Sequence, residues 1–148
     1  MAFQRILIGV DGSRGGESAT TIGGEMAAAM GAHVTIVHAV PLPPAVLGVD
    51  QAISDESLKW LEDSALRAVD VAGEMLDRMG VEHDRVIRPG GAVDVILDVA
   101  DERNADAIIV GHRGLGAMRR FILGSVSSKL AHHARCAVVL APVTEDET

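Results

Sequence analysis

The chain alternates short apolar runs with longer segments in which apolar residues recur every three or four positions. The runs predict five strands, at residues 5–10, 33–40, 81–88, 106–110 and 136–141. Helical periodicity occurs around residues 19–29, 58–79 and 93–100, and a further helix is expected after Ser125. Strands that alternate with helices in this way predict an α/β fold built on a parallel sheet.

Right-handed crossovers restrict how these strands can be ordered. The simplest arrangement is a doubly wound, Rossmann-like sheet with strand order 3-2-1-4-5 and helices on both faces. The charged strand at 81–88 then lies at one edge, the strand at 136–141 lies at the other, and the apolar strands at 5–10 and 106–110 lie inside. A ligand crevice is expected between the first and fourth strands, where the direction of winding reverses.

Two signals set the ends of the second helix. Ser54 followed by two acidic residues is typical of a helix start, and Gly80 is typical of a helix stop. The proline-containing segment 41–53 before this helix is the one long connection, and loops of that length often carry function. Whether it closes over a ligand is left open by the sequence.

Size and composition narrow the class of protein. With 148 residues the chain fits a single domain, residues 1–148, and 48% apolar but only 2% aromatic residues predict a core of aliphatic side chains. A net charge of −8 argues against binding along nucleic acid. The single cysteine, Cys136, excludes a disulfide within the chain and is expected to be a buried, reduced thiol. Without a membrane-length apolar run or a signal-peptide pattern, we expect a cytoplasmic protein with no membrane partner.

Two loops that carry polar and glycine residues meet at the expected crevice. Asp11 follows the first strand, where its carboxylate can hydrogen-bond a ribose or hold Mg²⁺. The alternative is that Asp11 or Ser13 only caps the first helix. Gly111 follows the fourth strand, and glycines there let backbone amides approach a phosphate, beside the positive end of the helix after Ser125. The residues therefore favour a nucleotide-binding domain, although the Walker A, GxGxxG and GxSxG patterns are absent.

The spacing Gly111-x2-Gly114-x9-Gly124-Ser125 resembles the nucleotide-binding signature of the universal stress protein family, in its ATP-binding branch. Segments 6–13 and 137–142 are similar to the opening and closing segments of that family. The resemblance covers nearly the whole chain and implies an adenine nucleotide as the ligand.

The resemblance also implies a role for each matching residue. Asp11 would contact the nucleoside, and Val40 and Val110 would lie against adenine. The ribose and phosphates of ATP would be surrounded by Gly111, Gly114, Gly124, Ser125, Val126 and Ser127. Gly9, Val10 and Arg113 complete the expected cofactor-binding set.

The remaining charged residues offer weaker candidates. Arg113, Arg119 and Arg120 could screen a triphosphate or contact a partner, or they could form a solvated loop face. The adjacent His132 and His133 point about 100° apart on a helix and are poorly placed to share a metal.

The other histidines are expected to be structural. We expect His38 to be a packed or hydrogen-bonded core residue, and His33 and His83 to lie on the surface.

No catalytic set is recognised, because nothing pairs with Asp11 as a clear base. The resemblance implies a nucleotide-responsive regulatory or stress-adaptation module with little or no turnover of ATP. It also implies a homodimer through the apolar edge strand at 137–141. Two alternatives stay open: a nucleotide-hydrolysing enzyme on a related fold, and an interaction protein whose pocket is empty.

Overall fold

The structure, a computed structural model, describes residues 2–41, 54–112 and 124–142. Within these residues the chain forms a five-stranded sheet in the order β3-β2-β1-β4-β5, and every strand pairing is parallel. The strands are β1 (Arg5–Gly9), β2 (His33–Val40), β3 (His83–Pro89), β4 (Ala107–Gly111) and β5 (Ala137–Ala141). The helices are α1 (Arg14–Met30), α2 (Asp55–Arg78), α3 (Ala92–Arg103) and α4 (Ser125–His133). The predicted fold class and strand order are confirmed.

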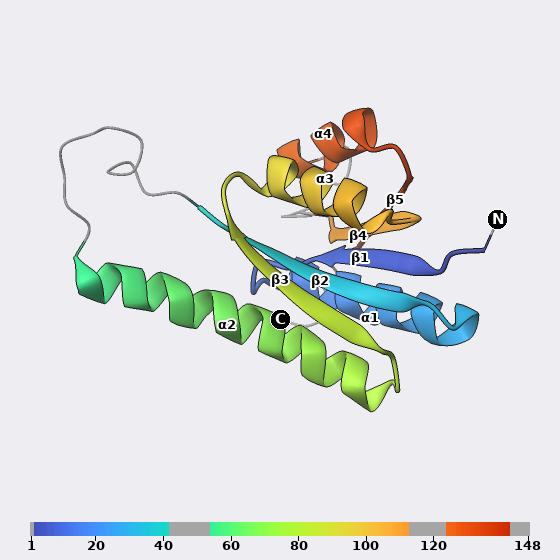
Figure 1. Cartoon of the computed structure of the whole chain (residues 1–148), viewed down its shortest axis with the longest axis horizontal. Coiled ribbons are helices and arrows are strands. Elements are labelled where there is room, and N and C mark those ends of the chain that lie inside the picture. Colours follow the sequence, from blue (N-terminus) through green and yellow to red (C-terminus); the bar gives the residue numbers. More distant parts are fainter. Residues whose placement is uncertain (1, 42–53, 113–123, 143–148) are drawn as a thin grey trace.

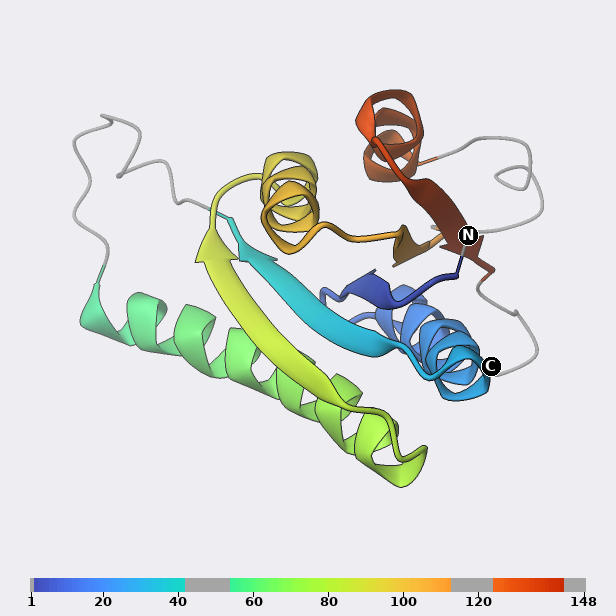
Figure 2. The ribbon, with the colours of Figure 1, turned by 45° about the vertical axis from the view of Figure 1, so that its right-hand side comes forward.

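Helices cover the sheet from both sides. Helices α1 and α2 lie on one face, and α3 and α4 lie on the other (Figures 1 and 2). Ile6 and Ile8 of β1 pack with the α1 and α2 side chains, whereas Leu7 packs with those of α3 and α4. Because the central strand is buried on both sides, its sequence is a continuous apolar run instead of an alternating one.

The predicted ends of α2 are confirmed. The Ser54 hydroxyl accepts a hydrogen bond from the Ser57 backbone N–H at 3.2 Å, which caps the first turn. At the other end Gly80 has a positive φ of 70°, and the Val81 N–H donates to the Leu76 carbonyl at 3.0 Å. Strand β3 therefore begins at His83, two residues later than predicted, because Val81 still belongs to the end of the helix.

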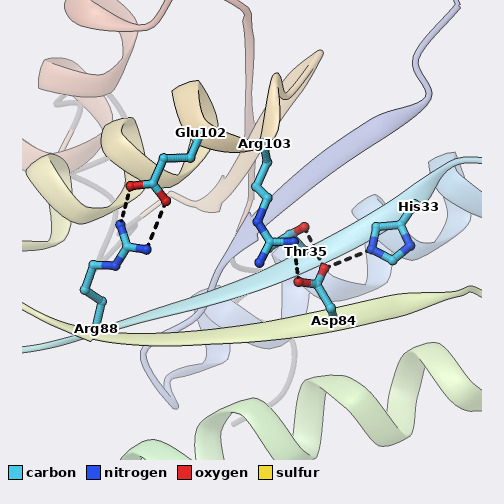
Figure 3. A network of polar contacts seen from close by, with 6 residues as sticks. All are labelled: His33, Thr35, Asp84, Arg88, Glu102 and Arg103. Carbon is cyan, nitrogen blue, oxygen red and sulfur yellow. Dashed lines mark hydrogen bonds and ion pairs between the residues drawn. The ribbon is translucent and has the colours of Figure 1, made fainter.

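Ion pairs hold the charged edge strand β3 (Figure 3). Asp84 accepts hydrogen bonds from the Thr35 hydroxyl at 2.8 Å and from His33 Nε2 at 2.9 Å, and it pairs with Arg103 at 2.6 Å. Burial raises the pKa of the Asp84 carboxyl, but these hydrogen bonds and the Arg103 charge outweigh it, so the pKa is lowered overall. The charges of this strand are thus satisfied against its neighbours.

The expectation for His83 is wrong. Its side chain is only 12% exposed, and Nε2 lies 2.8 Å from the Asp77 carboxylate at the end of α2. The chain turns back at Gly80, so the end of that helix covers a histidine only six positions further on, which the charged sequence of the strand alone does not indicate.

Asp106 joins the two central strands at their amino ends. Its carboxylate accepts hydrogen bonds from the backbone N–H groups of Gln4 and Arg5 at 2.8 and 2.9 Å. These bonds lower the pKa of the Asp106 carboxyl. The segment before β4 is thereby fixed to the start of β1.

None of the helices in the described ranges combines the length and the apolar character that crossing a bilayer requires.

Candidate functional site

A crevice lies where β1 and β4 end, on the side of the sheet that α3 and α4 cover. It has a volume of about 120 Å³. Six parts of the chain contribute its walls: the end of β1 with the following loop, the start of α1, β2, α3, the end of β4, and the start of α4. The residues are Gly9, Val10, Asp11, Ser13, Gly15, Gly16, Val37, Ala39, Ala92, Ile96, Val110, Gly111, Gly124, Ser125, Val126 and Ser127.

Most of the residues expected at the site come together here. Those that line the crevice are Gly9, Val10, Asp11, Val110, Gly111, Gly124, Ser125, Val126 and Ser127. Arg113 and Gly114 lie outside the described residues, as do Arg119 and Arg120.

Val40 is placed differently. It is half-buried at the end of β2, its carbonyl accepts a hydrogen bond from the Gly90 N–H at 2.9 Å, and it is not among the residues that line the crevice. Successive residues of a strand point to opposite faces, and from β2 the crevice is lined by Val37 and Ala39.

Seven crevice residues were not in the expected set. Three, Ser13, Gly15 and Gly16, follow Asp11 closely in the sequence, and the other four are Val37, Ala39, Ala92 and Ile96. The two from β2 lie on the face that packs with α3, but β2 carries apolar residues on both faces, so its sequence does not report which face meets the crevice. The two from α3 depend on how closely that helix approaches β1, which periodicity alone does not report.

The Asp11 carboxylate organises the turn between β1 and α1. It accepts a hydrogen bond from the Ser13 backbone N–H at 2.9 Å and another from the Ser13 hydroxyl. Gly12 between them has a φ of 85°, a conformation that favours glycine. Ser13 is the N-cap residue of α1 but makes no side-chain cap hydrogen bond. Asp11 is therefore positioned at the crevice by the turn in which it takes part.

His38 fixes the end of β1 from the neighbouring strand. Its Nδ1 lies 2.8 Å from the Val10 carbonyl, while the Val10 N–H donates to the Val37 carbonyl at 2.9 Å. A carbonyl only accepts, so Nδ1 carries the proton. The expected hydrogen bond of His38 is confirmed, although the residue is only half-buried, and the residue before Asp11 is held on both of its polar backbone groups.

Two glycines allow close approach in the crevice. A Cβ at Gly111 would lie 2.4 Å from the backbone of Gly15, so the end of β4 and the start of α1 touch through their main chains. A Cβ at Gly9 would lie 3.0 Å from Ile96 Cδ1 and 3.1 Å from Val110 Cγ1. Glycine at these positions serves packing as well as ligand access.

The amino end of α4 forms the opposite wall. Gly124 is its N-cap residue, and glycine has no side chain with which to cap the helix. The Ser128 N–H donates to the Gly124 carbonyl at 2.9 Å, so the amides of residues 125–127 precede the first intrahelical bond. These amides and the helix dipole make this wall suited to an anion.

Other candidate chemistry is weaker. Among residues 2–41, 54–112 and 124–142, no three His, Cys, Asp or Glu side chains gather as metal ligands would. Cys136 is a free, half-buried thiol, and its pKa is raised by burial and then by the nearby charges of Asp101 and Asp106. These features favour a structural cysteine.

Comparisons with known proteins agree on one family. A model described as the universal stress protein family matches residues 2–142. The universal stress protein in the QAH/OAS sulfhydrylase 3′ region of Thermus aquaticus is 35% identical over 139 residues, which cover 93% of this chain and 98% of that protein. Universal stress protein YxiE of Bacillus subtilis is 27% identical over 145 residues, with 93% and 98% covered.

Solved structures share the fold. Hypothetical protein MJ0577 matches with a TM-score of 0.81 at 19% identity, covering 98% of this chain and 99% of that one. The universal stress protein of Archaeoglobus fulgidus in complex with dAMP has a TM-score of 0.70 at 25% identity, with 95% and 98% covered. The Arabidopsis thaliana family protein At3g01520 with AMP bound has a TM-score of 0.73 at 20% identity, with 98% and 95% covered. The match over residues 2–142 and the 35% identity to the Thermus aquaticus protein establish that this chain belongs to the universal stress protein family.

Proposed function

We propose that the chain is a single cytoplasmic nucleotide-binding domain that holds ATP in the crevice between β1 and β4. It acts as a nucleotide-responsive regulatory module with little or no turnover. The observation that carries the proposal is that a carboxylate, Asp11, and the amino end of α4, whose N-cap residue is a glycine, line the same glycine-rich crevice.

The walls match the parts of a nucleotide. Apolar side chains of Val37, Ala39, Ile96 and Val110 suit a base, and the amides at the start of α4 suit phosphate oxygens. The volume of about 120 Å³ is below the roughly 300 Å³ typical of complete small-molecule pockets, so the described walls fit one end of a nucleotide. The AMP and dAMP in the structures of two family members support an adenine nucleotide.

Asp11 would contact the ribose or, with a triphosphate, hold Mg²⁺. Of the described residues that line the crevice, Asp11 is the only one with an ionisable side chain. A second group to activate water is therefore missing from these walls, which supports binding without efficient hydrolysis. Steady-state turnover above roughly 1 per second with Mg²⁺ and ATP would instead favour the hydrolase alternative.

The amino end of α4 offers a direct test. Gly124→Asp adds a negative charge beside the proposed phosphate site, while Gly124→Asn has nearly the same shape without the charge. Both residues are favoured at an N-cap, so neither should weaken the helix. In equilibrium dialysis we expect the Asp variant to bind ATP about tenfold or more weakly than the Asn variant, because like charges repel at close range.

Equal affinities of the two variants would show that the phosphates lie elsewhere. No binding of ATP, ADP or AMP by the unmodified chain would favour the empty-pocket alternative. Mass spectrometry of the nucleotide that copurifies with the protein would decide between ATP and AMP as the working ligand.

The edge strand β5 supports a second element of the proposal, a homodimer. Its three central residues, Val138, Val139 and Leu140, are apolar and only half-buried. An apolar strand at a sheet edge is a surface that a second copy can cover. Light scattering should give a dimer mass, and a monomer mass at every concentration would refute this part.

A further inference from the structure

A second hollow lies on the opposite face of the sheet, between α1 and α2. Its volume of about 350 Å³ is larger than that of the crevice and falls within the range of binding pockets. We call it the α1/α2 groove. From α2 it is lined by a stripe that includes Trp60, Arg67, Val71 and Met75, and from the other side by Asp11 and Glu17.

The amino-terminal part of α2 is not packed on the sheet. No residue from 54 to 64 is buried, and this end of the helix reaches past the ends of the strands (Figures 1 and 2). Trp60 is 64% exposed and Val71 is 45% exposed, although both are apolar. The described part of the chain therefore leaves an apolar helix face open to a partner.

The shape of this face suits another helix. The stripe from residue 60 to residue 75 repeats every three or four positions and is about 22 Å long at 1.5 Å per residue. A groove between two helices with such a stripe is the surface into which an amphipathic helix lays its apolar side.

The charges around the groove indicate the sign of the charge that a partner should carry. Asp11 and Glu17 line it from the β1–α1 side, and Arg67 is the one basic residue in its described lining. On α2 the exposed acids Glu56, Asp63 and Glu74 lie three or four positions from Trp60 or Val71 and so border the same stripe. An occupant with basic residues beside its apolar side complements this border.

The groove and the crevice share a wall. Val10, Asp11, Ser13 and Gly16 line both, because the turn between β1 and α1 separates the two hollows. A ligand that shifts this turn from one side changes the surface offered on the other.

We propose that the α1/α2 groove docks a basic amphipathic helix of a partner protein. A second part of the proposal, which rests on the proposed nucleotide function, is that ATP in the crevice changes the affinity for this helix through the shared turn.

Trp60 is the single tryptophan of the chain, so its fluorescence reports on the groove directly. The full chain, without nucleotide, is titrated with a tryptophan-free amphipathic peptide of leucine and lysine, about 18 residues long to match the stripe. The control peptide has glutamate in place of lysine. We expect saturable binding of the basic peptide and at least about tenfold weaker binding of the acidic one. No binding, or equal binding of both peptides, overturns the proposal.

A charge-matched pair of variants separates docking from general attraction to an acidic protein. Val71→Arg places a cation in the groove, and Leu66→Arg places the same charge at a 51% exposed residue of the same helix that does not line it. We expect Val71→Arg to lower the affinity for the basic peptide about tenfold and Leu66→Arg to change that affinity less than about twofold. Equal effects of the two variants would show that the peptide does not bind in the groove and would overturn the proposal. If the chain is a dimer and only Val71→Arg turns it into a monomer, the groove binds a second copy of the chain instead of a partner helix, and the proposal is overturned as well.

The nucleotide arm repeats the titration with saturating ATP. A change in peptide affinity of about threefold or more supports the coupling. If ATP binds and the peptide affinity is unchanged, the coupling is wrong while the groove result stands. If ATP does not bind at all, it is the proposed nucleotide function that has failed, and the nucleotide-free titration still decides the groove.

Discussion

The contact between Gly111 and Gly15 is the point where a single added methyl group should disrupt the packing of the crevice most strongly. In Gly111→Ala the new Cβ would lie 2.4 Å from Cα, C and O of Gly15, whereas ordinary contacts begin near 3.4 Å. The obstructing atoms are backbone, so they cannot rotate away as a side chain would. Either the start of α1 or the end of β4 must move by about 1 Å.

Inserting a methyl group into a packed site lowers the free energy of unfolding by about 1–3 kcal/mol. Because the neighbouring atoms here are backbone, we expect a loss in the upper part of this range, about 2–3 kcal/mol. For a chain of this size the melting temperature should fall by about 5–10 °C. Urea denaturation of the purified chain gives the free energy of unfolding, and a thermal melt gives the temperature.

Gly15→Ala is the matched control for the same contact. Its Cβ would lie 3.4 Å from Gly111 Cα, an ordinary distance, and Gly15 is in α1, where alanine is favoured over glycine by up to about 1 kcal/mol. We expect stability that is unchanged or higher. If the free energy of unfolding of Gly111→Ala lies within about 0.5 kcal/mol of that of the unmodified chain, the close approach of these two segments is incorrect.

Three further predictions concern stability and reactivity. Asp106→Asn should lower the free energy of unfolding by about 1 kcal/mol at pH 7. Because folding lowers the pKa of Asp106, the stability difference between the two proteins is complete above the pKa of about 3.9 that Asp has in an unfolded chain. It should vanish as the pH falls through the lower pKa of the folded protein, which denaturation from pH 7 to pH 2 would show. Leu76→Ala, at a fully buried side chain of α2, should cost about 2–5 kcal/mol, whereas Leu66→Ala, at an exposed one, should cost less than about 0.5 kcal/mol by the same denaturation assay. Because burial raises the pKa of the Cys136 thiol, it should react with iodoacetamide slowly at pH 7 and speed up only at a more alkaline pH than an exposed thiol does; rapid labelling at pH 7 would contradict this burial.

Strand order and the position of the crevice could be predicted because they follow from local patterns. The apolar runs at β1 and β4 identified the two central strands, and the charged run at β3 identified an edge. The loops after these two strands must then meet, which places Asp11 and Gly111 at the same crevice.

What escaped prediction depends on long-range geometry. Whether a residue of β2 lines the crevice changes with each step along the strand, and a sequence pattern at the strand end does not report which of Ala39 and Val40 does so. Leu58 continues the core periodicity of α2 but is 43% exposed, because the helix is longer than the sheet beneath it. The need for glycine at residue 111 comes partly from Gly15, which lies far away in the sequence.

The junction that Asp106 makes with residues 4 and 5 has a consequence for how the protein is made. The bonded partners are 101 and 102 positions apart, so β1 leaves the ribosome well before β4 does. At about 5–20 residues per second, the side of β1 that will meet β4 waits roughly 5–20 s without its neighbour during translation. During that interval β1 can pair only with β2, so one edge of this apolar strand has no partner, and it is there that chaperones would have most to protect.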